Sequence, residues 1–73
     1  QYDPDWWARR YVENMKAEDA ALEVRRMVNH DLPFLRTMGD RSVAQARVEE
    51  LNSLIAEVNK AIPESDRIEP VSL

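Results

Sequence analysis

Residues 39–63, GDRSVAQARVEELNSLIAEVNKAIP, hold the most regular apolar pattern in the chain. Its members are separated by four, three, four, three and four positions: Ala44, Val48, Leu51, Ile55, Val58 and Ile62. This spacing places all six side chains on one stripe of an α-helix. Ser42 is expected to cap that helix, with Gln45 completing a capping box. Pro63 ends it, because the residue before a proline is pushed out of helical geometry. The pattern predicts a helix over residues 43–62, about 30 Å long.

A second apolar stripe precedes Gly39, the single glycine of the chain. It consists of Ala21, Val24, Val28, Leu35 and Met38, with Leu32 beside the gap that Asp31 leaves. Gly39 suits a left-handed C-terminal cap for this helix. The short link of residues 39–41 then makes the two helices antiparallel neighbours. A coiled coil with another chain is the alternative partner for these stripes, so a homo-oligomer stays open, but the short link favours packing within one molecule.

Pro33 complicates the helix before Gly39. It lacks an amide hydrogen, and its ring clashes with the carbonyl of Asn29. Two interpretations follow: a helix that kinks near Pro33, or a break near His30 with a restart capped by Asp31. We favour one helix over residues 18–38, kinked near Pro33.

The chain begins with a further helix-start pattern. Asp3 is a suitable cap, Pro4 suits the first helical position, and Asp5 favours the positive end of the helix dipole. We expect a helix over residues 4–15. It either continues into the next helix or ends in a break that lets its aromatic face fold onto the hairpin, and we favour the break. Residues 63–73 carry two prolines and predict an extended tail, which either packs along a groove of the hairpin or links to a further segment.

Composition sets limits on the class of protein. The 73 residues make one small helical domain, residues 1–73, and because they begin with Gln1 we expect a piece of a longer protein. The net charge of −4 argues against nucleic-acid binding. Cysteine is absent, which excludes disulfides and thiolate metal sites and fits a cytoplasmic location. No apolar run approaches the roughly 20 residues that span a bilayer, so no membrane association is expected.

The titratable residues form no recognisable catalytic or metal-binding pattern. His30 is the single histidine, and its helical neighbours three and four positions away are not metal ligands. The adjacent carboxylates, such as Glu49 and Glu50, point apart on a helix, whereas two-carboxylate catalysis needs acids that face one another. We therefore expect no enzyme activity, no catalytic residue, no cofactor and no metal. The arginine doublets at residues 9–10 and 25–26 leave a weaker alternative, phosphate or nucleic-acid binding.

Two adjacent tryptophans in the first helix are the best candidates for partner contacts. Neighbouring helical residues point about 100° apart, so Trp6 and Trp7 do not both face one core. Tryptophan, tyrosine and arginine dominate interface energetics. The partner-binding candidates are Trp6, Arg10 and Tyr11.

Several short motifs resemble one family. These are the string Tyr2-Asp3-Pro4-Asp5-Trp6-Trp7, the segment Leu22-x-x-Arg25-Arg26, the segment Leu51-Asn52-x-x-Ile55, and the closing Glu69-Pro70-Val71. They are similar to the conserved domain of the DnaJ homologue subfamily C member 28 family, C-terminal part, as in its actinobacterial members. The family's upstream glycine-rich stretch is not in this sequence, and neither is the histidine-proline-aspartate signature of J domains. The resemblance implies a bacterial, chaperone-associated setting and assigns no catalytic residue.

Together these observations predict an all-α fold: an antiparallel hairpin of two long helices, a short N-terminal helix and an extended C-terminal tail. The expected function is a non-enzymatic protein–protein interaction module whose protein partner the sequence does not identify. The alternative is an accessory domain of an enzyme or chaperone system whose active part lies upstream.

Overall fold

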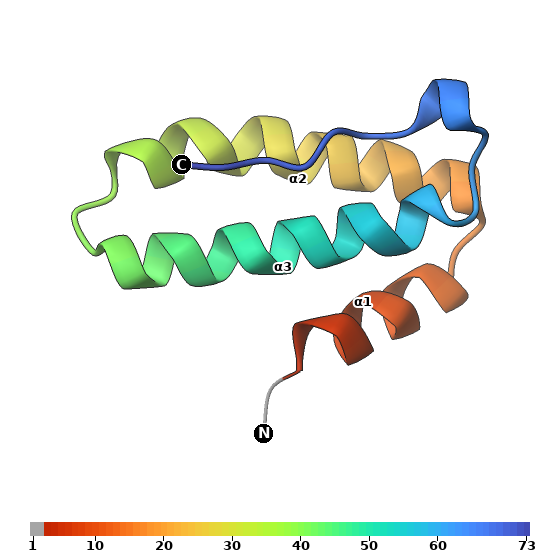
Figure 1. Cartoon of the computed structure of the whole chain (residues 1–73), viewed down its shortest axis with the longest axis horizontal. Helices are drawn as coiled ribbons and strands as arrows, with labels where there is room; N and C mark the ends of the chain where they lie inside the picture. The colour runs from red at the N-terminus through yellow and green to blue at the C-terminus, as the bar shows by residue number, and fades with distance from the viewer. Residues whose placement is uncertain (1–2) are drawn as a thin grey trace.

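The computed structural model describes residues 3–73, which form three α-helices and one short 3-10 helix. The helices are α1 (Pro4–Glu13), α2 (Ala17–Thr37) and α3 (Arg41–Asn59), and the 3-10 helix is η1 (Glu64–Asp66). As Figure 1 shows, α2 and α3 run antiparallel, α1 lies along the other side of α3, and the tail returns over the hairpin towards its tip. The all-α hairpin fold is confirmed.

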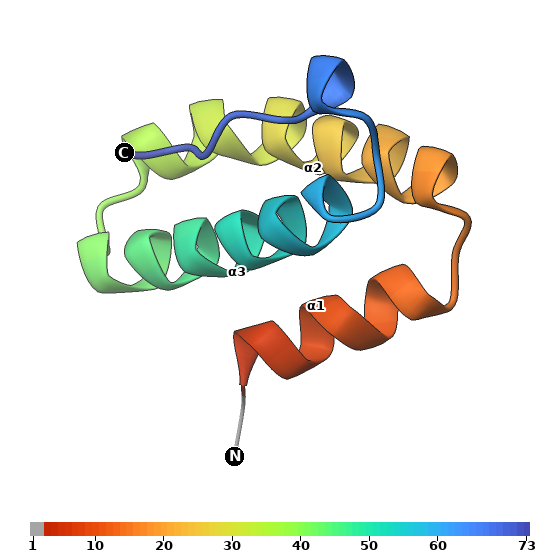
Figure 2. The same ribbon diagram turned by 45° about the vertical axis from the view of Figure 1, so that its right-hand side comes forward.

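The helices lie in one layer, with α3 in the middle. The Cα atoms extend 35 × 29 × 15 Å, and a helix with its side chains is about 10–12 Å thick. Figure 2 shows the same order of elements after a turn of 45°. Because a single layer cannot enclose a core by itself, the tail covers part of one face, and Ile68, Val71 and Leu73 pack against the core.

The core is built from the two predicted stripes and one additional face of α3. All six residues of the stripe in residues 44–62 are buried, and on α2 four of the five predicted stripe residues are buried as well. The buried residues are Ala8, Ala20, Ala21, Val24, Val28, Leu35, Ala44, Val48, Leu51, Leu54, Ile55, Val58 and Ile62. Leu54 lies off the stripe and is fully buried, since α3 also packs against α1.

The start of α1 follows its sequence pattern. Asp3 is the N-cap, and its carboxylate accepts a hydrogen bond from the Asp5 amide at 3.0 Å. The helix ends at Glu13, two residues earlier than predicted, because Asn14 closes it with a side-chain hydrogen bond to the Arg10 carbonyl. A break separates α1 from α2, as expected, and α1 folds back onto the hairpin.

The hairpin link differs from its prediction in two ways. Asp40, not Ser42, caps α3: its carboxylate accepts from the Val43 amide at 3.2 Å and from the Ser42 hydroxyl at 2.8 Å. Gly39 is not left-handed, since its φ is not positive. Instead, the Arg41 guanidinium donates to the last carbonyls of α2, at 3.3–3.4 Å. The Arg41 side chain therefore binds the carbonyls that a left-handed glycine cap was expected to satisfy.

The two long helices also end differently from their predictions. α2 continues through Pro33 without a break near His30, and the bend expected there stays a prediction. α3 ends at Asn59 instead of residue 62, and a tight turn over residues 60–62 follows. The turn reverses the chain while keeping Ile62 buried, so the stripe residue stays in the core although it has left the helix.

Candidate functional site

Trp6 and Arg10 form an exposed pair on α1. The two residues are four positions apart, so they share one helix face. The guanidinium carbon of Arg10 lies 5.6 Å from the centre of a Trp6 ring, which is cation–π distance. Trp6 remains 54% exposed. The guanidinium therefore lies against the ring and leaves more than half of Trp6 exposed.

Tyr11 does not join this pair but lies on the opposite, inward face of α1 with Trp7. Their ring centroids are 5.6 Å apart, and both residues pack against the core. Partial burial, with a smaller contribution from the Glu23 charge, raises the pKa of the Tyr11 hydroxyl. Of the three predicted contact residues, the structure thus brings Trp6 and Arg10 together and places Tyr11 with the packing residues.

Two asparagines of α3 bind the backbone of the tail. The Asn59 amide donates to the Ile68 carbonyl at 3.0 Å and accepts from the Ile68 N–H at 2.9 Å. The Asn52 amide makes the same pair of bonds with Val71, at 3.0 and 2.8 Å. Each asparagine therefore satisfies both backbone polar groups of one tail residue.

Two arginines of α2 hold the tail from the other side. Arg25 donates to the Asp66 carbonyl at 2.5 Å, and Arg36 donates to the Ser72 carbonyl at 3.3 Å. The tail lies between these donors and the asparagines, and we call the surface of α2 and α3 that it covers the tail groove. Figure 1 shows the course of the tail along the two helices. Of the two interpretations of residues 63–73, packing along the hairpin is confirmed. The tail is not extended throughout, since residues 64–66 form η1 and the extended part begins at Arg67.

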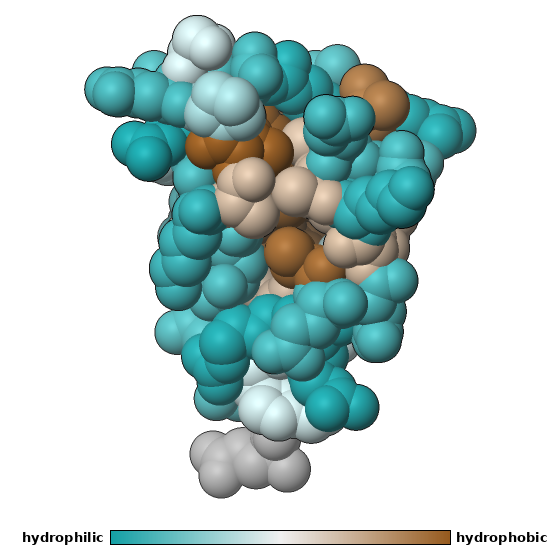
Figure 3. Space-filling view, turned by 90° about the vertical axis from the view of Figure 1, so that its right-hand side faces the viewer, coloured by the Kyte–Doolittle hydropathy of each residue, from teal (hydrophilic) through white to brown (hydrophobic). Residues whose placement is uncertain are grey.

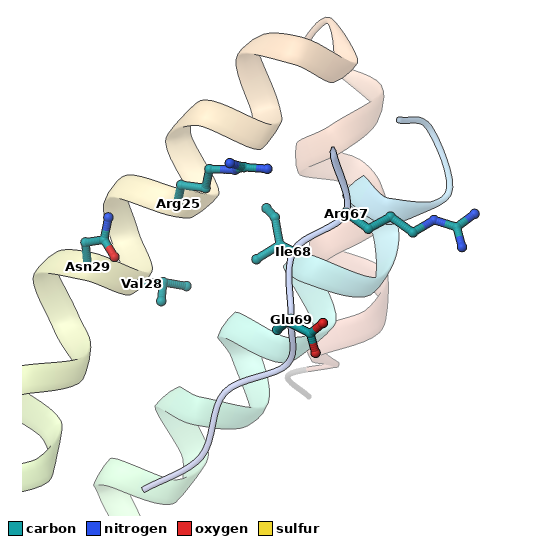
Figure 4. A pocket seen from close by; sticks show the side chains of 6 residues that line it. All are labelled: Arg25, Val28, Asn29, Arg67, Ile68 and Glu69. Atoms are coloured by element: carbon teal, nitrogen blue, oxygen red, sulfur yellow. The ribbon is translucent and has the colours of Figure 1, made fainter. Parts of the chain in front are cut away.

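The tail leaves part of this groove open. A hollow of about 350 Å³ remains on the α2 side of the tail. Figure 4 shows the residues that line it, three on α2 and three on the tail: Arg25, Val28, Asn29, Arg67, Ile68 and Glu69. The groove is thus wider than its present occupant at Ile68.

Apolar surface is also exposed at both ends of the hairpin. Near the link, a hollow of about 440 Å³ is lined by Phe34, Val43 and their neighbours, and Phe34 is 65% exposed. At the other end, Leu22 and Ile62 line a second hollow of about 350 Å³. Figure 3 views this second end, where apolar atoms show among hydrophilic ones. Trp6 lines neither of these two hollows.

An ion cluster connects α2 to α3 beside the hollow near the link. Arg47 contacts Asp31 at 2.7 Å and Glu50 at 2.9 Å, and His30 contacts Asp31 at 2.8 Å. Partial burial acts to raise the pKa of Asp31, but hydrogen bonds from His30 and Arg47, with the charge of Arg47, lower it below its usual value. Burial likewise opposes the Arg47 charge, while its two carboxylate partners raise the pKa of Arg47. The Asp31 gap in the apolar stripe is therefore filled by an interhelical ion pair.

Metal binding and membrane crossing are two properties that the described residues can be checked for. Within residues 3–73, no three histidine, aspartate or glutamate side chains gather where they could hold a metal ion. None of the helices in this range has both the length and the apolar character needed to cross a bilayer. What the structure offers is a set of surfaces, of which the tail groove has the most defined geometry.

Comparison of the chain with protein-family models, with curated proteins and with solved structures gives no match. The resemblance to the DnaJ homologue subfamily C member 28 family therefore stays a prediction. Of its first motif, Tyr2 lies outside the described residues.

Sequence reasoning missed the function of Asn52 and Asn59. They are seven positions apart, which places both on one face of α3 beside the apolar stripe. The sequence signal for these contacts is the seven-residue spacing of the asparagines, together with the apolar residues Ile68 and Val71 three positions apart in the tail. A polar residue beside a stripe is usually solvated, so the pattern is informative only when paired with an extended segment that has backbone groups to satisfy.

Proposed function

We propose that this chain is a non-enzymatic protein–protein interaction module. The observation that carries the proposal is the Trp6–Arg10 pair, in which a large aromatic ring stays half in water while the core is complete without it. Tryptophan and arginine are the residue types most enriched among interface hot spots. A fold that needed the ring for packing would have turned it inward, as it does Trp7.

The free energy available from Trp6 is of useful size. An aromatic side chain such as tryptophan buries about 150–250 Å². With 54% of Trp6 exposed, covering the remainder would remove about 100 Å² of mostly apolar surface from water. At about 25 cal/mol per Å², this corresponds to about 2.5 kcal/mol. The Arg10 guanidinium adds donors for a carboxylate or a backbone carbonyl of the partner.

The proposed setting is a bacterial cytoplasm in association with chaperone systems. The resemblance to the DnaJ homologue subfamily C member 28 family supports the bacterial and chaperone association, and the absence of cysteine fits the cytoplasm. The alternative is an accessory domain that packs against a segment upstream of it in a longer protein. The position of Trp6 in the first turn of α1, close to where such a segment would join, favours this alternative. Restoring upstream residues should then raise the thermal stability.

Phosphate or nucleic-acid binding ranks below both. Arg25 donates to the tail, Arg26 pairs with Glu23 at 2.6 Å, and Arg10 lies over Trp6. Three of the four doublet arginines therefore already have contacts, on a chain of net charge −4. A salt-dependent shift at these four arginines during a phosphate titration would support this function, and no shift would end it.

The test of the interaction module is a pull-down of the full-length protein from its own cell extract, with Trp6→Ala and Leu22→Ala compared. Leu22 is a matched control because it is 61% exposed at the other end of the hairpin. We expect Trp6→Ala to lose the partner and keep its helical circular dichroism, while Leu22→Ala keeps both. Retention of the partner by Trp6→Ala would refute the assignment of this surface, and loss of folding would show that Trp6 belongs to the core.

A further inference from the structure

The asparagines in the tail groove recognise a backbone and not a side chain. Asn52 and Asn59 each donate one bond and accept one bond, and all four bonds go to main-chain groups of Val71 and Ile68. The paired donor and acceptor of each amide imitate the edge of a β-strand, through which many proteins bind extended peptides. Any residue except proline at these two positions would satisfy them.

The spacing of the two asparagines matches the repeat of an extended chain. Seven helical residues rise about 10.5 Å along α3. The three residues from 68 to 71 span about 9–10 Å in an extended or polyproline conformation. Arg67, with φ −61° and ψ 147°, starts the tail in that conformation. The two contacts therefore hold an extended segment in one register along the C-terminal part of α3, from Asn52 to its last residue, Asn59.

The tail groove places few requirements on the side chains of the segment that occupies it. Ile68, Val71 and Leu73 are each half-buried, while Arg67, Glu69, Pro70 and Ser72 are exposed. Pro70 falls between the two residues that the asparagines bind, so its missing N–H costs no contact. The hollow beside Ile68 leaves room for a larger apolar residue there (Figure 4). The requirements reduce to an extended segment with apolar residues at its first and fourth positions.

We propose that the tail groove is a binding site for an extended segment of a partner protein, which the chain's own residues 67–73 occupy as a displaceable internal ligand. The partner segment carries apolar residues three apart, each with a free backbone N–H. Because the internal ligand is tethered, its effective concentration is of millimolar order, so it closes the groove until it is displaced or released. The inference does not depend on Trp6, and either surface can fail without the other.

The experiment uses the full chain with Ile68→Asp and Val71→Asp, which places charges where the tail packs and so releases it. The probe is a fluorescent peptide of residues 64–73 with the unmodified sequence. We expect the released chain, with its helical circular dichroism retained, to bind the peptide at least about 10-fold more tightly than the unmodified chain does, since the tethered competitor is gone. No binding to a folded released chain would overturn the proposal.

Two altered peptides test what the groove recognises. N-methylation of the Val71 amide removes the donor to Asn52 and should weaken binding about 10-fold. A peptide in which Arg67, Glu69 and Ser72 are replaced by alanine should bind as the unmodified peptide does. Equal binding of the N-methylated peptide, or loss of binding by the alanine peptide, would contradict recognition through the backbone.

Two further outcomes are decisive. If the released chain fails to fold, millimolar peptide added to the unmodified chain should shift the side-chain amide resonances of Asn52 and Asn59, and no shift would overturn the proposal. Sedimentation of the unmodified chain alone tests whether the tail groove is instead occupied by the tail of a second copy of the chain. A dimer that Ile68→Asp and Val71→Asp abolish would show that the segment comes from a second copy, which contradicts the assignment to a partner protein.

Discussion

Replacing Asn52 with alanine should destabilise the fold and release the tail, although the residue lies outside the core. The substitution removes two hydrogen bonds, at 2.8 and 3.0 Å. Each contributes about 1 kcal/mol, because the groups involved are only part-buried and water replaces the lost partners. Alanine is the better helix former, which returns about 0.6 kcal/mol. The net loss is about 1.4 kcal/mol, or about 6–11 °C in the melting temperature of a domain of this size.

A matched control separates the two contributions. Asn29 is exposed in the middle of α2 and lines the hollow beside Ile68, but no side-chain hydrogen bond within residues 3–73 joins it to the tail, so Asn29→Ala should show the gain in helix propensity alone. Urea titration of both variants should give free energies of unfolding that differ by about 2 kcal/mol, with Asn29→Ala the more stable. If the two variants proved equally stable, the Asn52 contacts would contribute nothing and the reasoning would be refuted.

The same substitution predicts a coupling to Asn59. Removing either asparagine already loosens the tail, so the second asparagine then has less bound tail to stabilise. The double change Asn52→Ala with Asn59→Ala should therefore lower the free energy of unfolding by about 0.5–1.5 kcal/mol less than the sum of the two single changes. Hydrogen exchange gives the local view. In Asn52→Ala the Ile68 amide, although bonded to Asn59, should lose protection as well. Strict additivity with unchanged protection would mean that the two contacts act independently.

Three other predictions concern the hairpin. Leu54→Ala should cost about 2–5 kcal/mol by chemical denaturation, because its side chain is fully buried, while Leu22→Ala at an exposed site should stay within about 0.5 kcal/mol. Similar losses for both would contradict the packing. Gly39→Ala should be neutral or stabilise the fold by up to about 1 kcal/mol in thermal melts, since the φ of Gly39 is not positive and an added Cβ meets nothing within 4 Å. A large loss of stability would instead indicate that Gly39 is a left-handed cap. The pKa of Asp31 is lower in the folded state than its ordinary 3.8, so the folded state binds the proton more weakly than the unfolded state does. The stabilisation that ionised Asp31 gives to the fold is therefore fully present above about pH 4, and it is lost as the pH falls through the pKa of the folded state. Acid titration of Asp31→Asn should therefore show a flatter fall in stability below about pH 4, and an unchanged slope would remove Asp31 from the account.

The sequence predicted the parts of the fold that depend on periodic burial. The stripe from Ala44 to Ile62 and its counterpart on α2 identify the two faces that pack together, and all of these residues except the part-buried Met38 are buried. The boundaries were harder because several residues near each end compete for the same cap. Asp40 and Ser42 both suit an N-cap, and the carboxylate, the stronger acceptor, holds that position with the hydroxyl bonded to it.

The candidate site was predicted in part. Helical spacing correctly separates Trp6 from Trp7, but Tyr11 is four residues from Trp7 and shares its inward face, so it does not belong with Trp6. Arg41 took the place of the left-handed Gly39 because a long guanidinium reaches carbonyls that no local pattern assigns to it. Backbone recognition by Asn52 and Asn59 leaves almost no trace in the tail sequence, since the groups recognised are the same in every residue.

The central claim is that two asparagines of α3 hold an extended segment by its main chain. The most direct measurement is the nuclear Overhauser effect between side-chain amide protons of Asn52 and the backbone amide proton of Val71 in the unmodified chain, with Asn59 and Ile68 as the second pair. The account predicts cross-peaks for both pairs, together with slow exchange of the Val71 and Ile68 amides. Absence of both cross-peaks, with those amides exchanging as fast as exposed ones, would contradict it.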